Sequence, residues 1–206
     1  MSDQKRPYRK KRRAELEEET RRRITESAVE LHGTVGPART SMSAVAERAG
    51  VRRSTLYRHF PDEAALFEAC SADWNAANPP PDIGAWAAID NPDERLHTAL
   101  DELYAFWRRT EPMMANLIRD EKTSANVRRH FAGFHDYMDA ARDILLAGRG
   151  LRGRARKRVQ AAIGHALAFS TWQSLVHEQG LDDPEAVELA LALVTAASAR
   201  DRTVAA

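Results

Sequence analysis

Residues 40–60 read TSMSAVAERAGVRRSTLYRHF, and two short helices can be predicted from this stretch alone. Ser41 can cap the first helix, and Gly50 can end it, since glycine tolerates the left-handed conformation common at helix ends. Between them, apolar residues recur at i, i+3, i+4 and i+7, the spacing that places side chains on one side of a helix. These residues are Met42, Val45, Ala46 and Ala49.

A second helix is predicted to begin within two residues of Val51. Leu56 and Phe60 lie four positions apart and are expected to face the core, which leaves the other side chains largely free to point outward. Two short helices joined by a glycine turn, the second rich in hydrogen-bond donors, form a helix-turn-helix. The outward side chains are Arg52, Arg53, Ser54, Thr55, Tyr57, Arg58 and His59.

The order of residues here also resembles a known family. The matching runs are residues 49–51, 54–60 and 66–67, preceded by Ile24, Ala28, Leu31, Gly36 and Thr40-Ser41. Across roughly residues 20–70 the chain is similar to the DNA-binding domain of the tetracycline-repressor (TetR) family of bacterial regulators. The resemblance implies an all-α fold: an N-terminal three-helix helix-turn-helix domain joined to a C-terminal helical bundle that binds a ligand and dimerises.

The first turn of the second helix is the part that reaches base edges in the major groove, where an arginine can fork onto guanine. It contains Arg53, Ser54 and Thr55, of which Thr55 can equally pack in the core. The resemblance implies that Tyr57 and His59 contact phosphates, which fixes register on the duplex. We expect a DNA-binding set made up of Ser41, Arg52, Arg53, Ser54, Thr55, Tyr57, Arg58 and His59.

Three positions depart from the family pattern. Arg52 stands where the family usually has a capping serine, so the helix loses a cap and gains a cation. Glu63 stands where the family commonly has a lysine that pairs with phosphate, so this anchor is expected to be absent. His32 replaces an aromatic residue, most often phenylalanine, and is expected to be a packed ring.

Charge is distributed unevenly along the 206 residues. Residues 1–70 hold 15 Lys/Arg against 11 Asp/Glu, whereas residues 71–206 hold 16 against 19. The positive balance therefore lies with the helix-turn-helix, as neutralisation of DNA phosphates requires. With 43% hydrophobic residues, the chain can bury one large core or two smaller ones.

The sequence predicts a cytoplasmic protein without a membrane partner. No apolar run approaches the roughly 20 residues that span a bilayer, and no apolar segment follows the basic N-terminus. A single cysteine, Cys70, excludes a disulfide framework and suits a reducing compartment. Its spacing favours a small buried hydrophobic residue over a redox sensor.

Residues 1–14 are predicted to form a disordered basic arm. Residues 1–13 carry seven Lys/Arg against one acid, Asp3, and have no apolar partners with which to pack. Two functions stay open for this arm. It can lie along phosphates or in the minor groove, or it can be a solubilising tail.

The predicted helix-turn-helix domain with its connecting helix covers residues 15–78, and the regulatory and dimerisation domain covers residues 79–206. The first helix is expected near residues 15–32, and a fourth begins at residues 61–63 and ends at Asn78. Three prolines at 79–81 then form a stiff connection. Further helices are expected at 92–107, 111–122, 124–146, 156–179 and 186–199, without any strand.

The last two predicted helices favour a dimer. Residues 156–179 are apolar on more than one face, and residues 186–199 hold one charge, Glu188. A helix that is apolar all round must be covered on every side, and the simplest cover is the same pair from a second copy. The resemblance implies the same interface. The alternative is a monomer with an ordinary core.

Large aromatic and methionine side chains on the inner helices can line a cavity for an apolar or aromatic effector. The same residue types also fill cores, so both interpretations stay open for each of them. On helices that enclose a ligand in the resembled family, the candidate pocket residues are Tyr104, Trp107, Met113, Met114, Leu117, Phe131, His135, Met138, His165, Phe169 and Trp172.

No catalytic motif, phosphate loop or metal-ligand spacing stands out, so we expect no enzyme activity and no cofactor. An enzyme inside a helical bundle would have only His135 and His165 as candidates. The basic run at residues 148–158 is expected to be a solvated loop, with a second nucleic-acid patch as the alternative. The sequence thus predicts a homodimeric repressor that a small molecule releases from a DNA operator. The alternative is an effector-independent DNA-binding protein whose C-terminal domain only dimerises.

Overall fold

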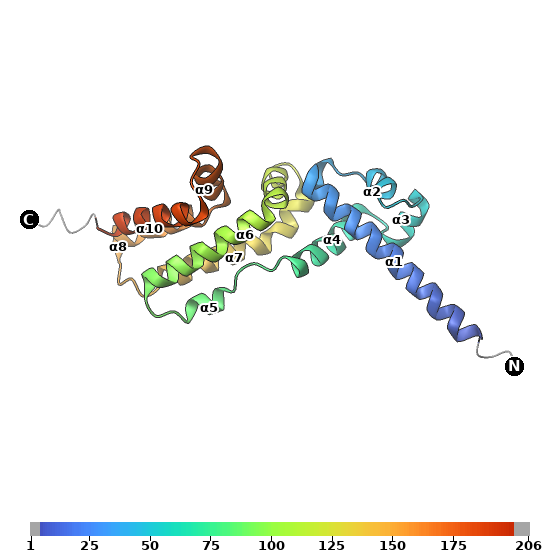
Figure 1. Cartoon of the computed structure of the whole chain (residues 1–206), viewed down its shortest axis with the longest axis horizontal. Helices are drawn as coiled ribbons and strands as arrows, with labels where there is room; N and C mark the ends of the chain where they lie inside the picture. The colour runs from blue at the N-terminus through green and yellow to red at the C-terminus, as the bar shows by residue number, and fades with distance from the viewer. Residues whose placement is uncertain (1–4, 200–206) are drawn as a thin grey trace, which may run out of the picture. The chain divides into compact units, whose positions relative to one another are not determined.

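The computed structural model describes residues 5–199, and every regular element in this range is a helix (Figure 1), which confirms the all-α class. The helices are α1 Lys5–Thr34, η1 Pro37–Arg39 (a 3₁₀ turn), α2 Met42–Arg48, α3 Arg53–His59, α4 Glu63–Ala77, α5 Ile83–Ala87, α6 Pro92–Glu121, α7 Ala125–Leu146, α8 Gly153–Leu167, α9 Phe169–Gln173, η2 Ser174–Glu178 (a π-helical turn) and α10 Asp183–Ala199.

The chain divides into two compact units. The first, called the N-terminal unit below, contains residues up to Pro79 together with residues 112–131. The second, the C-terminal unit, contains residues 80–111 and those from Ala132 onward. The boundaries fall inside α6 and α7, so both helices contribute residues to both units.

The predicted helix-turn-helix is confirmed in the N-terminal unit. The Ser41 hydroxyl accepts a hydrogen bond from the Ala44 amide at 3.2 Å and so caps α2. Gly50 adopts φ +63° in the turn that leads to α3. α1 packs against α2 and α4. The core beneath these helices contains Ile24, Ala28, Met42, Val45, Ala46, Ala49, Leu56, Phe60, Leu66 and Cys70.

The prediction of a disordered arm is wrong from Lys5 onward, because α1 begins there and not near residue 15. Residues 1–4 of that arm lie outside the described residues. Lysine, arginine, alanine and glutamate are good helix formers, and pairs four positions apart support the extension. Lys11 pairs with Glu15 at 3.9 Å, and Arg13 pairs with Glu17 at 3.1 Å.

The end of α1 is held by the last turns of α6. The Asn116 side-chain amide donates to the carbonyl oxygens of His32 and Gly33, both at 2.9 Å, and so satisfies carbonyls at the helix end. Asp120 accepts from the Ala38 amide at 2.9 Å and from Arg119 at 2.7 Å. Burial acts to raise the pKa of Asp120, but these two bonds outweigh it and lower the pKa below its usual value.

Pro112 lies inside α6, so the predicted helix break before it is wrong. Proline lacks an amide hydrogen, and its ring opposes the helical turn before it. The helix is continuous from Pro92 to Glu121, and the boundary between the two units falls at this proline. The short helix α5 was also not predicted. Asp82 caps it by accepting from the Gly84 amide at 2.8 Å, and Trp86 is fully buried.

The long helix predicted at residues 156–179 is interrupted. Ala168 is extended, with φ −67° and ψ 134°, and separates α8 from α9, which continues into the π-helical turn η2. The break frees carbonyl groups at the end of α8. The Tyr104 hydroxyl donates to the carbonyl oxygen of Ala166 at 3.0 Å, which satisfies one of them.

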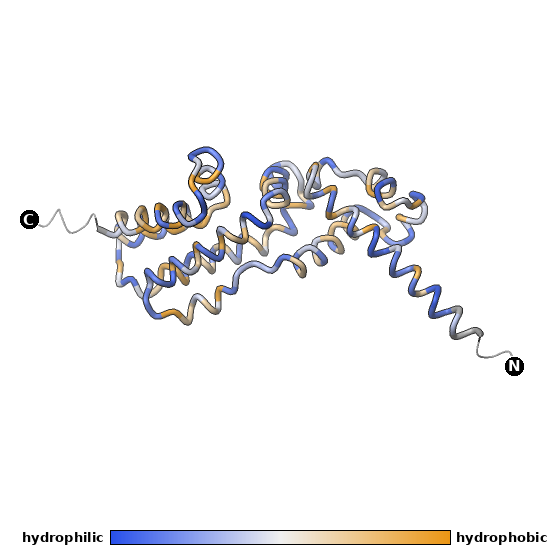
Figure 2. Tube along the Cα trace, in the orientation of Figure 1, coloured by the Kyte–Doolittle hydropathy of each residue, from blue (hydrophilic) through white to orange (hydrophobic). Residues whose placement is uncertain are grey.

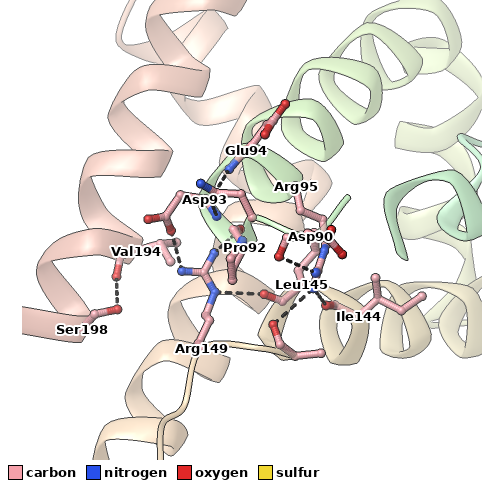
Figure 3. Close-up of polar contacts among 12 residues, drawn as sticks. Asp90, Pro92, Asp93, Glu94, Arg95, Ile144, Leu145, Arg149, Val194 and Ser198 are labelled. Carbon is pink, nitrogen blue, oxygen red and sulfur yellow. Dashed lines mark hydrogen bonds and ion pairs between the residues drawn. The ribbon is translucent and has the colours of Figure 1, made fainter. Parts of the chain in front are cut away.

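Two arginines join the start of α6 to the end of α7 (Figure 3). The buried Arg95 donates to the carbonyl oxygens of Ile144 at 2.9 Å and Ala147 at 3.2 Å. Arg149 donates to the Pro92 carbonyl oxygen at 2.6 Å and the Asp93 carboxylate at 2.7 Å. A cation is favourable where the last carbonyls of a helix point, so these contacts stabilise the C-terminal end of α7.

Helix α10 packs mainly on α8 through Ala186, Val187, Ala190 and Val194, all of which are buried. Beside this buried side α10 also carries exposed apolar residues, and Figure 2 shows hydrophobic residues along most of the helix. Leu189 and Leu193 are 40% and 51% exposed. With Ala192 and Ala196, which are also exposed, they form the α10 stripe, at the i, i+3, i+4, i+7 spacing of one helix face.

Candidate nucleic-acid interface

The side chains of α3 divide into an exposed polar face and a buried apolar one. Leu56 is fully buried and Phe60, which ends the helix, is 1% exposed. Thr55 is half-buried, in keeping with the two roles that the sequence left open for it. Most of the predicted DNA-binding residues are exposed, on α3 and at the starts of α2 and α3: Ser41, Arg52, Arg53, Ser54, Tyr57 and Arg58.

His59 differs from the other members of the predicted set. The ring is half-buried, and its Nε2 is enclosed without a hydrogen-bond partner among the described residues. Burial lowers its pKa, and the nearby Arg58 and Arg21 lower it further, so the ring is neutral near pH 7. A phosphate contact from this residue would have to use the other ring nitrogen.

Contacts from α1 fix the orientation of α3. The Arg21 guanidinium lies 4.3 Å from the centre of the Phe60 ring and donates to the His59 carbonyl oxygen at 3.2 Å. A cation over an aromatic face combined with a bond to the last turn of α3 ties that turn to the longest helix of the unit. At the end of α2, Arg48 pairs with Glu30 of α1. Contacts of α1 with α2 and α3 therefore hold the exposed face of α3 in a fixed orientation.

The three departures from the family pattern have clear local consequences. Arg52 occupies the N-cap of α3 and makes no side-chain cap bond. Glu63 is the first residue of α4, where the helix dipole favours a carboxylate, and Asp62 supplies the cap by accepting from the Ala65 amide at 2.8 Å. His32 is buried and tilted against Phe67 with ring centres 5.3 Å apart, as predicted for a packed ring.

Cys70 is also buried, as the sequence predicted. Its sulfur lies 3.5 Å from His32 Nδ1 and 3.3 Å from the Phe67 carbonyl oxygen. Burial raises the pKa of the thiol to about 12 and lowers that of the His32 ring to about 4. Both groups are uncharged near pH 7, which fits a packing role for the thiol.

The helix-turn-helix geometry agrees with a direct comparison of sequences. Residues 24–70 match the family model described as bacterial regulatory proteins, tetR family. Residues 24–70 are a TetR-family domain. The match begins at Ile24 in α1 and ends at Cys70 in α4, so it contains the whole TetR-family helix-turn-helix and its core, and it confirms the resemblance drawn from the sequence.

Solved structures show that the likeness in fold extends beyond the TetR-family domain. A TetR-like transcriptional regulator from Rhodococcus sp. RHA1 matches with a TM-score of 0.62 at 19% identity, over 85% of this chain and 93% of that one. NalD, the secondary repressor of the MexAB-OprM multidrug efflux pump in Pseudomonas aeruginosa, gives 0.58 at 20% identity over 89% and 97%. FadR from Bacillus subtilis, solved with stearoyl-CoA, gives 0.56 at 16% identity over 86% and 97%. Comparison with curated proteins gives no match.

The eleven residues predicted to line an effector pocket are divided between the two units. Met113, Met114, Leu117 and Phe131 belong to the N-terminal unit, and the other seven belong to the C-terminal unit. Most of the eleven are buried or half-buried, but His135 and His165 are exposed. Neither histidine therefore supplies the interior position that an enzyme inside the bundle would need.

The structure brings three of the predicted pocket residues into one aromatic cluster. Phe169 lies between Trp107 and Trp172, with ring centres 5.4 and 5.6 Å away. Phe134, which was not predicted as a pocket residue, adds an edge contact with Trp107 at 5.8 Å. Its place in the apolar repeat of the predicted helix at 124–146 was the signal that could have included it. The Trp107 indole N–H is buried and has no hydrogen-bond partner among the described residues.

Two further features of residues 5–199 bear on other functions. They contain no group of three or more histidine, cysteine, aspartate or glutamate side chains placed to hold a metal ion. None of the helices in that range combines the length and apolar character needed to cross a membrane.

Proposed function

We propose that the protein is a homodimeric, sequence-specific DNA-binding repressor that a small apolar or aromatic effector releases from its operator. The observation that carries the proposal is the set of exposed side chains on α3, whose guanidinium and hydroxyl donors lie on a helix that α1 holds in place. Arginine can read guanine in the major groove, and the hydroxyls of Ser54 and Tyr57 can contact bases or phosphates. Such a repressor would act in the cytoplasm, where bacterial DNA lies.

The α10 stripe supports the dimer. Leu189 and Leu193 leave apolar surface in water although the buried side of α10 packs on α8. Covering this stripe with the same stripe of a second copy removes that surface from water in a two-fold arrangement. Two recognition helices would then bind half-sites one DNA turn apart, about 34–36 Å, on a near-palindromic operator.

The aromatic cluster in the C-terminal unit supports an effector. An indole N–H buried without a partner is costly, and a ligand carrying a hydrogen-bond acceptor would satisfy Trp107. The π-helical turn η2 follows α9 directly, and such turns often occur at functional sites. A ligand that prefers a conformer with displaced recognition helices would lower operator affinity by its differential binding energy.

Selection of bound duplexes from a random DNA library tests the DNA-binding part of this proposal. We expect enrichment of a near-palindromic sequence with half-sites about 10 base pairs apart. Recovery of sequences without any common element would contradict operator recognition.

A thermal-shift screen of apolar and aromatic compounds then distinguishes the repressor from an effector-independent DNA-binding protein. An effector raises the melting temperature because it stabilises the folded state by RT ln(1 + [L]/Kd), and it should release the selected DNA in a gel-shift titration. Unchanged operator affinity at saturating ligand would support the effector-independent alternative.

A further inference from the structure

A pocket lies wholly within the N-terminal unit, and none of the predicted effector residues lines it. Its volume is about 410 Å³, within the range of small-molecule sites. Its walls come from the end of α1, the starts of α2, α4 and α7, and the turn between α6 and α7. These segments are far apart in sequence and meet around one space.

Two side chains that line this pocket carry hydrogen-bond acceptors without a partner among the described residues. Asn126 lines it, and the Oδ1 of this side chain is buried without a partner among the described residues. Glu63 is exposed and lines the pocket, and no cation in the described range pairs with its carboxylate. A buried acceptor without a donor is a polar group that a ligand can satisfy.

His32 also lines the pocket. Its Nδ1 lies 3.5 Å from the Cys70 sulfur, which also lies 3.3 Å from the Phe67 carbonyl oxygen. The neutral ring has one N–H donor and one acceptor nitrogen. Apolar walls complete the space, among them Val45, Leu66 and Phe67, and no lysine or arginine side chain of the described residues lines it.

We propose that this pocket binds a small organic cation, an amine or amidinium that carries a compact apolar body. The cationic head donates to Glu63 and Asn126, and the apolar body rests on the Leu66 and Phe67 side chains. The charged Glu63 carboxylate and the Asn126 Oδ1 match a ligand with several N–H donors. An anionic ligand would meet the Glu63 carboxylate without a compensating cation.

The position of the pocket connects ligand binding to the orientation of α3. α2 and α4 flank α3 in the chain, and both contribute walls, so an occupant that fills the space biases how these two helices pack and thereby where α3 points. The ligand therefore changes operator affinity, and DNA changes ligand affinity by the same factor. This second step rests on the proposed DNA binding, whereas ligand binding itself does not.

Calorimetric titration of the full-length protein with benzamidine tests the site, with benzamide as the uncharged analogue and benzoate as the anion. We expect saturable binding of benzamidine, weaker binding of benzamide and none of benzoate. Glu63→Gln should weaken benzamidine binding about ten- to hundredfold, because it removes a charge-assisted hydrogen bond. Glu68→Gln, which removes another exposed carboxylate from α4 outside the pocket, should leave it unchanged.

A second variant tests the location independently of charge. Val127 is 1% exposed and lines the pocket, so Val127→Phe should fill the space and abolish binding while circular dichroism shows a folded helical protein. The proposal is overturned if benzamidine does not saturate, if benzoate binds more tightly, or if Glu63→Gln and Glu68→Gln behave alike. Saturable binding with unchanged affinity for the selected DNA overturns only the coupling and leaves the proposed function standing.

Discussion

Two helical faces of this protein are exposed, and they differ in chemistry. The α3 face carries Arg53, Tyr57 and Arg58, whose polar groups are well hydrated in the free protein. The α10 stripe carries two leucines and two alanines, which gain nothing from water. Exposure alone therefore does not identify an interface. A donor-rich face is stable in water and can bind a polyanion reversibly, whereas an apolar stripe is stabilised by permanent contact with an apolar partner.

The largest expected effect comes from charging the apolar face. Leu193→Glu would bury a carboxylate in the proposed dimer seam, so we expect a monomer in analytical ultracentrifugation. Operator affinity should fall by about 10²–10⁴, since the second half-site no longer adds avidity. Thr195→Glu is the matched control, because it adds the same charge to an exposed position on the other side of α10. A dimer that survives Leu193→Glu would remove the reason for assigning the stripe to self-association.

The contacts between the end of α1 and the last turns of α6 should be next in sensitivity. Gly36 has φ +96°, and a Cβ there would overlap the Arg119 guanidinium and come within 2.5 Å of the Asp120 carboxylate. Gly36→Ala combines backbone strain with disruption of charged hydrogen bonds, so we expect about 3 kcal/mol of destabilisation in urea unfolding.

Gly50→Ala provides the comparison for this prediction. Gly50 has φ +63° but nothing within 4 Å of the added Cβ, so only strain remains and about 1 kcal/mol is expected. Equal destabilisation in the two variants would show that the hydrogen bonds of Arg119 and Asp120 do not stabilise the unit.

Direct readout by the donor-rich face should produce a smaller, sequence-dependent effect. Arg53→Ala should weaken binding to the selected operator by about 1–3 kcal/mol and relax preference at one base pair of each half-site. Arg154→Ala removes the same charge from an exposed position at the start of α8 and should have little effect. A comparable weakening by Arg154→Ala would instead support the second nucleic-acid patch in the basic run at residues 148–158.

The two faces also show how far sequence reasoning reaches. The positions of α2 and α3 followed from signals within a few residues: the Ser41 cap, the Gly50 turn and one apolar stripe. The exposed polar set on α3 was accessible for the same reason. Local signals were enough because short helices begin and end where their caps are.

Errors arose where distant residues determine the structure. Pro112 predicted a helix end, yet α6 continues through it. No glycine or proline at Ala168 predicts the helix break there. The Tyr104 hydroxyl, which donates to a carbonyl oxygen freed by the break, is 62 positions away from it in the chain. The hydrogen bonds of Asn116 with the end of α1 span 83 and 84 positions. The pocket in the N-terminal unit was missed because its walls come from such separated segments.

The N-terminal half of α1 offers the smallest and most specific test. Among its exposed basic residues, Lys11 and Arg13 pair with glutamates, whereas Lys10 and Arg12 have no partner in the described chain. If the arm binds phosphates, Lys10→Ala with Arg12→Ala should reduce the slope of log affinity against log salt by ~0.9 for each phosphate that is no longer neutralised. Affinity measured at several salt concentrations gives that slope directly, and the helix itself should persist because alanine is a strong helix former. An unchanged slope would favour the solubilising tail and confine the phosphate-binding surface to the helix-turn-helix.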